Sequence, residues 1–169
     1  MTVNSIFIGT RIEALQKVEE LTSVIEIITV KDSFVHKARA NSKLVNKDNK
    51  QDINKHIYNS KAELVISAGY PFILPSEVLK TNKIFINSHP SILPFYKGRK
   101  CIKRAYENNE SIYGCTLHYM NELVDSGKII YQMKKSLKNY SLDKIYQYLF
   151  SKCEVHVIEK GLKMILNKV

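Results

Sequence analysis

The sequence predicts an α/β fold with a mostly parallel, twisted sheet and helices on both of its faces. Short apolar runs rich in β-branched residues, as at 24–30 and 63–68, are typical of strands buried in such a sheet. Segments with apolar residues at helical spacing lie between these runs, and this alternation favours parallel strands joined by helices. The 169 residues are 44% hydrophobic and 25% charged, a length and composition that predict one folded domain over residues 1–169.

The first three elements follow a strand–helix–strand pattern. Residues 3–8 form an apolar run that ends at Gly9, and glycine commonly marks the end of a strand. Residues 11–21 repeat apolar side chains at three- and four-residue intervals, which indicates one face of a helix. Residues 24–30 are dominated by isoleucine, valine and threonine and therefore predict a second strand.

The next stretch has a polar part and an apolar part. Residues 31–60 are rich in Asn and Lys and are predicted to be irregular, with Ile53 and Ile57 as the one hint of a helix. Residues 63–68 form a short apolar run of the kind found in strands that are buried on both faces. A serine is expected to cap a short helix over residues 76–80.

The second half of the chain is predicted to add strands and to end on a long helix. A strand over 83–87 runs into a loop with two prolines that closes at Gly98. Residues 113–120 alternate, so that Thr116 and His118 share one face of a strand. The later strands read as an addition to the parallel sheet, for which an antiparallel orientation is open. The elements predicted after the loop are a helix over 97–108, strands over 113–120 and 128–133, and helical structure from 141 onward.

The charge balance predicts an anionic partner. Lys and Arg number 26 against 16 Asp and Glu, a formal charge of +10 that suits nucleic acid, a membrane surface or a phosphorylated small molecule. Five of the cations lie within residues 97–104, where they could hold a phosphate group or nucleic acid. Phe95 and Tyr96 precede them and would suit base stacking, but no RNA-binding motif is present, so nucleic-acid binding is the less favoured interpretation.

Cysteine content and hydropathy predict a cytoplasmic protein without a membrane span. The three cysteines are an odd number, which argues against a disulfide framework and for a reducing compartment. The N-terminus lacks the basic and apolar regions of a signal peptide, and no apolar run approaches the ~20 residues that cross a bilayer.

Asn87 and His89 are candidate catalytic residues. They lie two positions apart at the carboxyl end of a predicted strand, so their side chains point to the same side at the edge where α/β sheets bind ligands. A carboxamide can donate a hydrogen bond to a developing oxyanion, and an imidazole titrates near neutral pH. The spacing alone favours the simpler interpretation of a turn-forming Asn and a structural His.

His118 and Asp125 form a second candidate pair, because a carboxylate near an imidazole orients it and raises its pKa. The alternative is that Asp125 only begins a turn before the last strand. Cys115 and His118 are three residues apart and would lie on opposite faces of a strand, so no metal site is predicted. Gly9 is followed by neither a dinucleotide-binding fingerprint nor a P-loop, so it is first of all a residue that turns the chain.

Two segments together resemble the folate-dependent formyltransferases. Residues 86–98, Ile-Asn-Ser-His-Pro-Ser-Ile-Leu-Pro-Phe-Tyr-Lys-Gly, are similar to the N-x-H-P-S-L-L-P-x-Y/F-x-G signature of that family. Residues 114–132 are similar to its G-x-T-x-H…D-x-G-x-I-x-x-Q stretch. The resemblance is clear from about residue 64 to residue 132, and it implies a Rossmann-like formyltransferase core.

The resemblance implies an active enzyme that uses 10-formyltetrahydrofolate as formyl donor and a primary amine as acceptor. It places the catalytic residues at Asn87, His89 and Asp125. The amine would attack the formyl carbon, and Asn87 with protonated His89 would stabilise the tetrahedral oxyanion. Asp125 would support the imidazolium and accept the proton of the amine.

The resemblance also implies how the folate is held. The pterin would lie in an apolar cleft, for which the matching segments nominate Phe72, Ile73, Leu74 and Val124. A cis peptide bond is implied at Leu93–Pro94, in the loop that carries the catalytic histidine.

The acceptor amine is expected to belong to an amino sugar, and more specifically to one linked to a nucleotide. The phosphoribosylglycinamide formyltransferases of purine synthesis carry a G-S-N-type phosphate loop where this chain has Gly-Thr-Arg, so that acceptor is the alternative. A second alternative is an inactive, formyltransferase-like module that binds nucleic acid. Assembly into a homo-oligomer stays open. The residues nominated to bind a small, phosphorylated amine are Gly9, Thr10, Lys97, Arg99 and His118.

Overall fold

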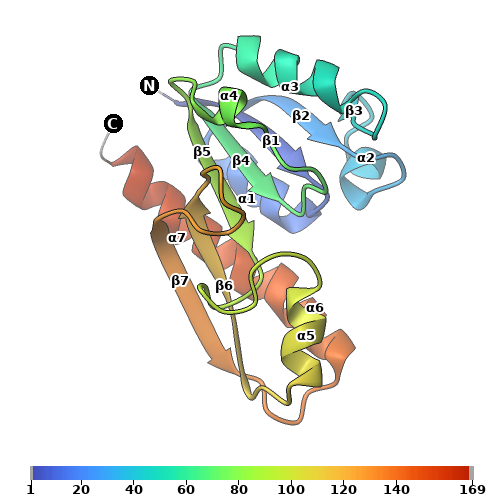
Figure 1. Ribbon diagram of the computed structural model, residues 1–169, viewed down its shortest axis with the longest axis vertical. Coiled ribbons are helices and arrows are strands. Elements are labelled where there is room, and N and C mark those ends of the chain that lie inside the picture. The colour runs from blue at the N-terminus through green and yellow to red at the C-terminus, as the bar shows by residue number, and fades with distance from the viewer. Residues whose placement is uncertain (1, 168–169) are drawn as a thin grey trace. The chain divides into compact units, whose positions relative to one another are not determined.

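The computed structural model describes residues 2–167 of the chain, which divides into an N-terminal unit, Met1–Asn87, and a C-terminal unit, Ser88–Val169. The N-terminal unit is built on parallel strands in the order β3-β2-β1-β4 (Figure 1). These strands are β1 (Asn4–Gly9), β2 (Ser23–Thr29), β3 (Lys43–Leu44) and β4 (Leu64–Ala68).

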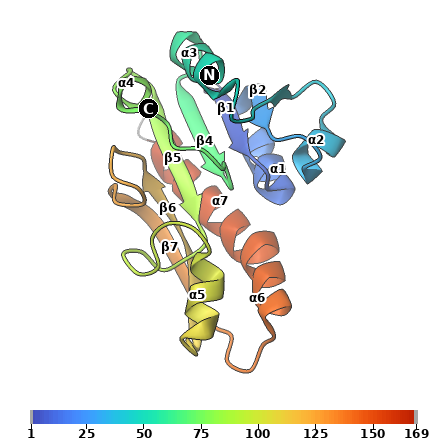
Figure 2. The same ribbon diagram turned by 45° about the vertical axis from the view of Figure 1, so that its right-hand side comes forward.

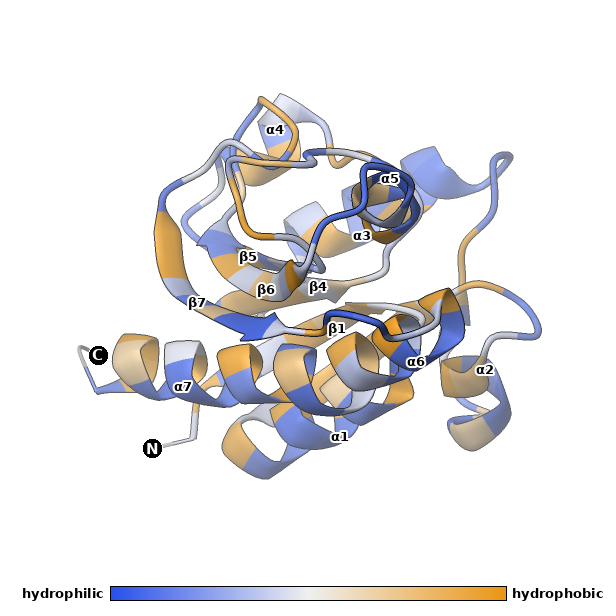
Figure 3. Ribbon diagram, turned by 90° about the horizontal axis from the view of Figure 1, so that it is seen from below, coloured by the Kyte–Doolittle hydropathy of each residue, from blue (hydrophilic) through white to orange (hydrophobic). Residues whose placement is uncertain are grey.

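The two central strands of this unit form its core. Ile6, Phe7 and Ile8 of β1 are fully buried, and every residue of β4 is buried as well. Helix α1 (Ile12–Leu21) covers one face of the strands, while α3 (Lys50–Asn59) and α4 (Ser76–Leu79) lie on the other (Figure 3). Strands that are covered on both faces have to be apolar throughout, which explains the uninterrupted apolar runs in the sequence.

The prediction that residues 31–60 are irregular is wrong, because this stretch holds α2 (Phe34–Ala38), β3 and α3. The hydroxyl of Ser33 caps α2 by accepting a hydrogen bond from the backbone N–H of His36. Ile53 and Ile57 lie one turn apart on α3 and are buried. The elements are short and polar on their outer side, so only this pair of isoleucines marked the stretch in the sequence.

Strand β5 (Ile84–His89) begins in the N-terminal unit and ends in the C-terminal unit. It is longer than predicted, so Asn87 and His89 both lie within it. The helix predicted at 76–80 is α4, but its N-cap is Pro75 rather than a serine.

The C-terminal unit pairs two antiparallel strands, β6 (Ile112–Tyr119) and β7 (Ile129–Ser136) (Figure 2). Helix α5 (Cys101–Glu107) lies on one side of this pair, and α6 (Leu142–Tyr148) and α7 (Glu154–Leu166) lie on the other (Figure 3). A π-helical turn, η1 (Leu149–Cys153), joins α6 to α7. The parallel N-terminal strands, the antiparallel addition and the helices on both faces confirm the predicted fold class.

The faces of β6 are those that the alternation in the sequence predicts. Leu117 lies under α7, where a side chain at Gly161 would meet it, so that face belongs to the core. Thr116 and His118 therefore occupy the opposite face. None of the helices within residues 2–167 combines the length and apolar character that a membrane span needs.

Candidate active site

The carboxyl end of β5 carries the first two predicted catalytic residues. Asn87 is half-buried and His89 is 7% exposed. Because they are two positions apart in one strand, their side chains leave β5 on the same side. His89 belongs to the C-terminal unit, as do the residues that surround its ring.

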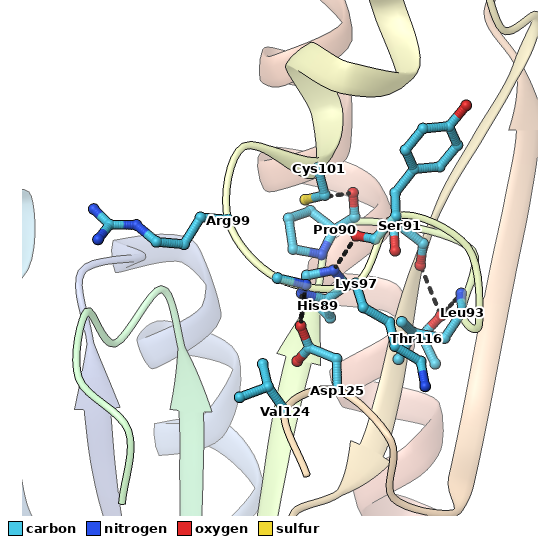
Figure 4. Close-up of polar contacts among 12 residues, drawn as sticks. His89, Pro90, Ser91, Leu93, Lys97, Arg99, Cys101, Thr116, Val124 and Asp125 are labelled. Carbon is cyan, nitrogen blue, oxygen red and sulfur yellow. Dashed lines mark hydrogen bonds and ion pairs between the residues drawn. The ribbon is translucent and has the colours of Figure 1, made fainter. Parts of the chain in front are cut away.

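Both ring nitrogens of His89 face hydrogen-bond acceptors (Figure 4). Its Nε2 lies 3.0 Å from the backbone oxygen of Tyr96, and its Nδ1 lies 3.3 Å from Oδ2 of Asp125. A neutral imidazole has a proton on only one nitrogen, whereas a charged one can donate to both partners. The geometry therefore suits an imidazolium at this position.

Asp125 lies between two imidazoles. Its Oδ2 faces His89 and also accepts a 2.8 Å hydrogen bond from the backbone N–H of Gly98. Its Oδ1 lies 3.5 Å from Nε2 of His118, whose other nitrogen, Nδ1, lies 2.8 Å from the backbone oxygen of Tyr119. The His118–Asp125 pair that the sequence nominated is thus brought together, and the carboxylate serves both rings.

Burial and nearby charges shift the pKa values of His89 and Asp125 in opposite directions. Burial lowers the pKa of His89 below its ordinary value, and the Asp125 carboxylate and the Tyr96 carbonyl offset part of that effect. Burial works to raise the pKa of Asp125, but the hydrogen bond from His118, the charge of His89 and the Gly98 N–H together hold it below its ordinary value. Asp125 is therefore a stable carboxylate beside an imidazole that takes up a proton less readily than usual.

The catalytic loop, defined as residues 90–98, supplies two of these contacts through its backbone, by the Tyr96 carbonyl and the Gly98 N–H. Backbone groups carry no signature in a sequence, so sequence reasoning missed both. The expected cis peptide bond at Leu93–Pro94 is present.

The basic cluster after this loop is divided between structural and exposed cations. Lys97 donates a 2.7 Å hydrogen bond from Nζ to the hydroxyl of Ser126. Arg104 folds back and donates to the backbone oxygens of Arg99 and Lys97. Arg99 itself is exposed and points away from His89 and Asp125 in Figure 4. Of the two cations nominated for the acceptor, Lys97 therefore contacts the residue next to Asp125, and Arg99 points away from it.

In the N-terminal unit, the turn after β1 meets the turn after β4. The backbone N–H of Thr10 donates to Ala68, at 3.0 Å, and the Thr10 hydroxyl donates to the carbonyl of Gly69, at 3.2 Å. Arg11 lies over the same place, with its Nη1 3.5 Å from the Thr10 hydroxyl. Arg11 is also the N-cap of α1, without a side-chain capping bond. Arg11, which was not nominated from the sequence, thus lies next to the nominated Gly9 and Thr10.

The nominated apolar residues differ in exposure. Ile73 is 73% exposed, Val124 is 49% exposed and Phe72 is half-buried, so each presents apolar surface. Leu74 is 2% exposed and contributes its side chain to the core. Within residues 2–167, no group of His, Cys, Asp and Glu has a metal-binding arrangement.

Comparison with known proteins identifies the family. Residues 7–158 match the formyl transferase family. The phosphoribosylglycinamide formyltransferase of Haemophilus influenzae is 36% identical over 83 residues, which are 48% of this chain and 39% of that enzyme. The chain thus spans well under two thirds of the length of this relative.

Two solved structures share the fold over nearly the whole chain. The phosphoribosylglycinamide formyltransferase of Campylobacter jejuni is 26% identical, with a TM-score of 0.82 and 98% coverage of both chains. A formyltetrahydrofolate deformylase from Pseudomonas syringae is 20% identical, with a TM-score of 0.86, 99% coverage of this chain and 62% of the other. Because the family match extends over most of the sequence and includes the whole site described above, the chain belongs to the formyl transferase family.

Proposed function

We propose that the protein transfers a formyl group from 10-formyltetrahydrofolate to the primary amine of phosphoribosylglycinamide. The observation that carries the transfer reaction is the contact between His89 and Asp125, whose side chains are 8% and 9% exposed. His89 lies two residues after Asn87 in the segment that resembles the formyltransferase signature. A carboxylate held next to an imidazole can supply a proton acceptor and a positive charge for the attack of an amine on a formyl carbon.

In the proposed mechanism, the amine attacks the formyl carbon and a tetrahedral intermediate with a negatively charged oxygen forms. The carboxamide of Asn87 donates a hydrogen bond to that oxygen, and a single such donor is commonly worth about 10²–10³ in rate. The ring of His89, when protonated during the reaction, adds a positive charge near that oxygen while its two nitrogens keep their partners. Asp125 stays ionised through its hydrogen bonds and accepts the proton of the amine, directly or through water. The intermediate then collapses: the bond to the folate nitrogen breaks, that nitrogen takes up the proton that the amine gave up to Asp125, and tetrahydrofolate leaves.

Exposed apolar side chains support the folate as the formyl donor. Ile73 and Val124, nominated for the pterin, are accompanied by Leu123, which is 69% exposed. A contiguous exposed apolar patch is a surface that a ligand or a partner covers, and Leu123 and Val124 present neighbouring apolar side chains of this kind. Leu74 is buried, so we do not expect it to contact the ligand itself.

The choice of acceptor follows the relatives rather than the first expectation from the sequence. Two of the three proteins compared above are named phosphoribosylglycinamide formyltransferase, and none acts on an amino sugar by its name. The missing G-S-N-type loop counted against this acceptor. Arg11 supports it, because a guanidinium at the end of β1 and the beginning of α1 offers a phosphate two charge-assisted hydrogen bonds.

The test is a transfer assay with 10-formyltetrahydrofolate and phosphoribosylglycinamide. The absorbance of the folate monitors the reaction, and mass spectrometry identifies the acceptor product. We expect tetrahydrofolate and an acceptor that has gained one formyl group. Ribosylglycinamide without its phosphate should react at least about tenfold less efficiently, since a charged hydrogen-bonded contact is worth about 1.5–3 kcal/mol. If the protein formylates an amino-sugar nucleotide but not phosphoribosylglycinamide, the proposed acceptor is wrong. If formate is released in the absence of any amine, the protein is a deformylase instead.

The catalytic assignments predict the effect of three substitutions in the same assay. Asn87→Ala, His89→Ala and Asp125→Ala should each lower kcat at least about 100-fold with little change in thermal unfolding temperature. Asn82→Ala and His36→Ala remove the same side-chain types outside the proposed site and should be neutral. Full activity of any of the three catalytic variants would remove that residue from the mechanism.

A further inference from the structure

The catalytic loop orients both catalytic side chains of the C-terminal unit through its backbone. The carbonyl of Tyr96 accepts from His89, and the N–H of Gly98 donates to Asp125. Neither contact can form unless the loop lies in this one place. The groups that hold the loop therefore also determine the geometry of the reacting pair.

The loop is fastened to the strand pair by a group of hydrogen bonds around Thr116. The Thr116 hydroxyl donates to the carbonyl of Ser91, at 2.7 Å, and accepts from the N–H of Leu93, at 3.2 Å. The Nε2 of Gln132 donates to the same hydroxyl, at 2.8 Å, and to the carbonyl of Leu93, at 3.0 Å. Three of these hydrogen bonds tie two loop residues, Ser91 and Leu93, to β6 and β7, and the fourth joins the two strand side chains to each other.

These two side chains are placed by the register of the strands. Thr116 and Gln132 are directly opposite each other in the antiparallel pair, and Thr116 is fully buried. Thr116 also shares its face of β6 with His118, which faces Asp125. The same strand face therefore fixes the loop and carries the second imidazole of the cluster.

The Gln132 amide nitrogen and the Thr116 hydroxyl are engaged within the protein. Both hydrogens of the Gln132 amide nitrogen are donated, one to Thr116 and one to Leu93, and the Thr116 hydroxyl both donates and accepts. Their polar atoms are thus directed at the loop and at each other, which is the arrangement of residues that act through their neighbours.

We propose that Thr116 and Gln132 are positioning residues: they hold the catalytic loop so that Tyr96 and Gly98 keep His89 and Asp125 in the geometry of the reaction. The inference rests on the proposed formyl transfer and extends it to two residues that do not touch the reacting atoms. Small displacements of reacting groups are costly, since about 1 Å can lower a rate about 100-fold.

Nearly isosteric substitutions test this role. Thr116→Val and Gln132→Met keep the size of each side chain and remove its hydrogen bonds, whereas Thr116→Ser keeps the hydroxyl. We expect kcat to fall about 10- to 100-fold in the first two, with KM for folate and acceptor within about threefold of the wild type. Thr116→Ser should retain most of the activity. Gln147→Met, the same substitution at an exposed position of α6, is the matched control.

A second measurement separates positioning from the function itself. The ring protons of His89 can be followed by NMR during a pH titration, with no substrate present. Loss of the loop contact should lower the pKa of His89, because the Tyr96 carbonyl raises it. Gln132 is only half-buried, so Gln132→Met should stay folded even if Thr116→Val does not.

The outcomes are distinguishable. Folded variants with unchanged kcat and an unchanged His89 titration would overturn the positioning role, as would a rise in KM with kcat preserved. If the wild-type protein transfers no formyl group but the His89 titration still shifts in Gln132→Met, the proposed function fails and the positioning role is supported.

Discussion

At the scale of the residue, the site is defined by a conflict between burial and hydrogen bonding at His89. Both partners of the ring are acceptors, which favours the charged form, while burial favours the neutral form. Burial prevails, so the ring of the free protein takes up a proton only below its ordinary pKa of 6.5. A proton that arrives with the amine, or a charge that develops on the substrate, would therefore change the state of this ring during the reaction.

Replacing the carboxylate predicts a further decrease in the pKa of His89. Asp125→Asn keeps the shape of the side chain and removes the charge that stabilises the imidazolium. NMR titration should place the pKa of His89 below 6.5 in the wild type and lower still in the variant. A higher pKa in Asp125→Asn would show that the carboxylate does not act on this ring.

The lowered pKa of His89 also affects the stability of the folded protein. A histidine with a lowered pKa in the folded state binds fewer protons than in the unfolded chain once the pH falls below 6.5. Folding is therefore weakened as the pH decreases through that range. The contribution of Asp125 has its own window, because a carboxylate with a lowered pKa loses its stabilising effect only when the pH falls below about 4.

Much of this residue-level picture could be read from the sequence, but not all of it. The placement of Asn87 and His89 at the carboxyl end of a strand, two positions apart, was predicted from the sequence and is found in β5. The approach of His118 to Asp125 depends on how the turn after β6 folds back, which spacing does not encode. The contacts from Tyr96 and Gly98 come from backbone atoms and were outside the reach of any argument from side-chain type.

At the scale of the element, the ends of two strands determine where the N-terminal turn lies. Gly9 has a φ of 146°, and a Cβ at this position would lie 2.0 Å from the carbonyl oxygen of Ala68 at the end of β4. No L-residue with a side chain fits so close to a backbone atom. Gly9 therefore has the structural role that the sequence suggested first, and it places Thr10 and Arg11 beside Gly69.

Gly9→Ala should consequently destabilise the protein by about 2–4 kcal/mol, since it combines an unfavourable backbone conformation with a clash against a central strand. Chemical denaturation with circular dichroism measures the change in the free energy of unfolding. Ser23→Ala, at an exposed position of β2, is the control and should change it by less than about 0.5 kcal/mol. A neutral Gly9→Ala would mean that β1 and β4 can separate at this end.

The elements between residues 31 and 60 show where periodicity ceases to predict structure. Helix α2 has five residues and strand β3 has two, lengths at which no repeat of apolar residues can be recognised. By contrast, the long apolar stretches of β1 and β4 and the alternation in β6 were predicted within one or two residues. Length and burial on two faces, rather than composition, separated the elements that could be predicted from those that could not.

At the scale of the whole molecule, the formal charge of +10 is divided among different roles. Lys97 and Arg104 fasten the catalytic loop, and Lys103 lies 3.6 Å from Glu107 on the same helix. Arg99 and Lys100 stay exposed after this loop. The basic cluster of residues 97–104 is therefore in large part a structural feature of the loop, which weakens the nucleic-acid interpretation that its composition first suggested.

The chain divides between Asn87 and Ser88, inside β5, so one strand supplies the last four residues of one unit and the first two residues of the other. β5 is therefore one continuous strand across this division, which falls between Asn87 and His89. We therefore predict that the units unfold together, as one domain of 169 residues would. Native-state hydrogen exchange can test this, because the slowest amides of β1 and of β6 should open with the same free energy and the same dependence on denaturant. If the slowest amides of one unit open with a distinctly smaller free energy than those of the other, each unit folds separately. The expectation of a single domain would then be wrong.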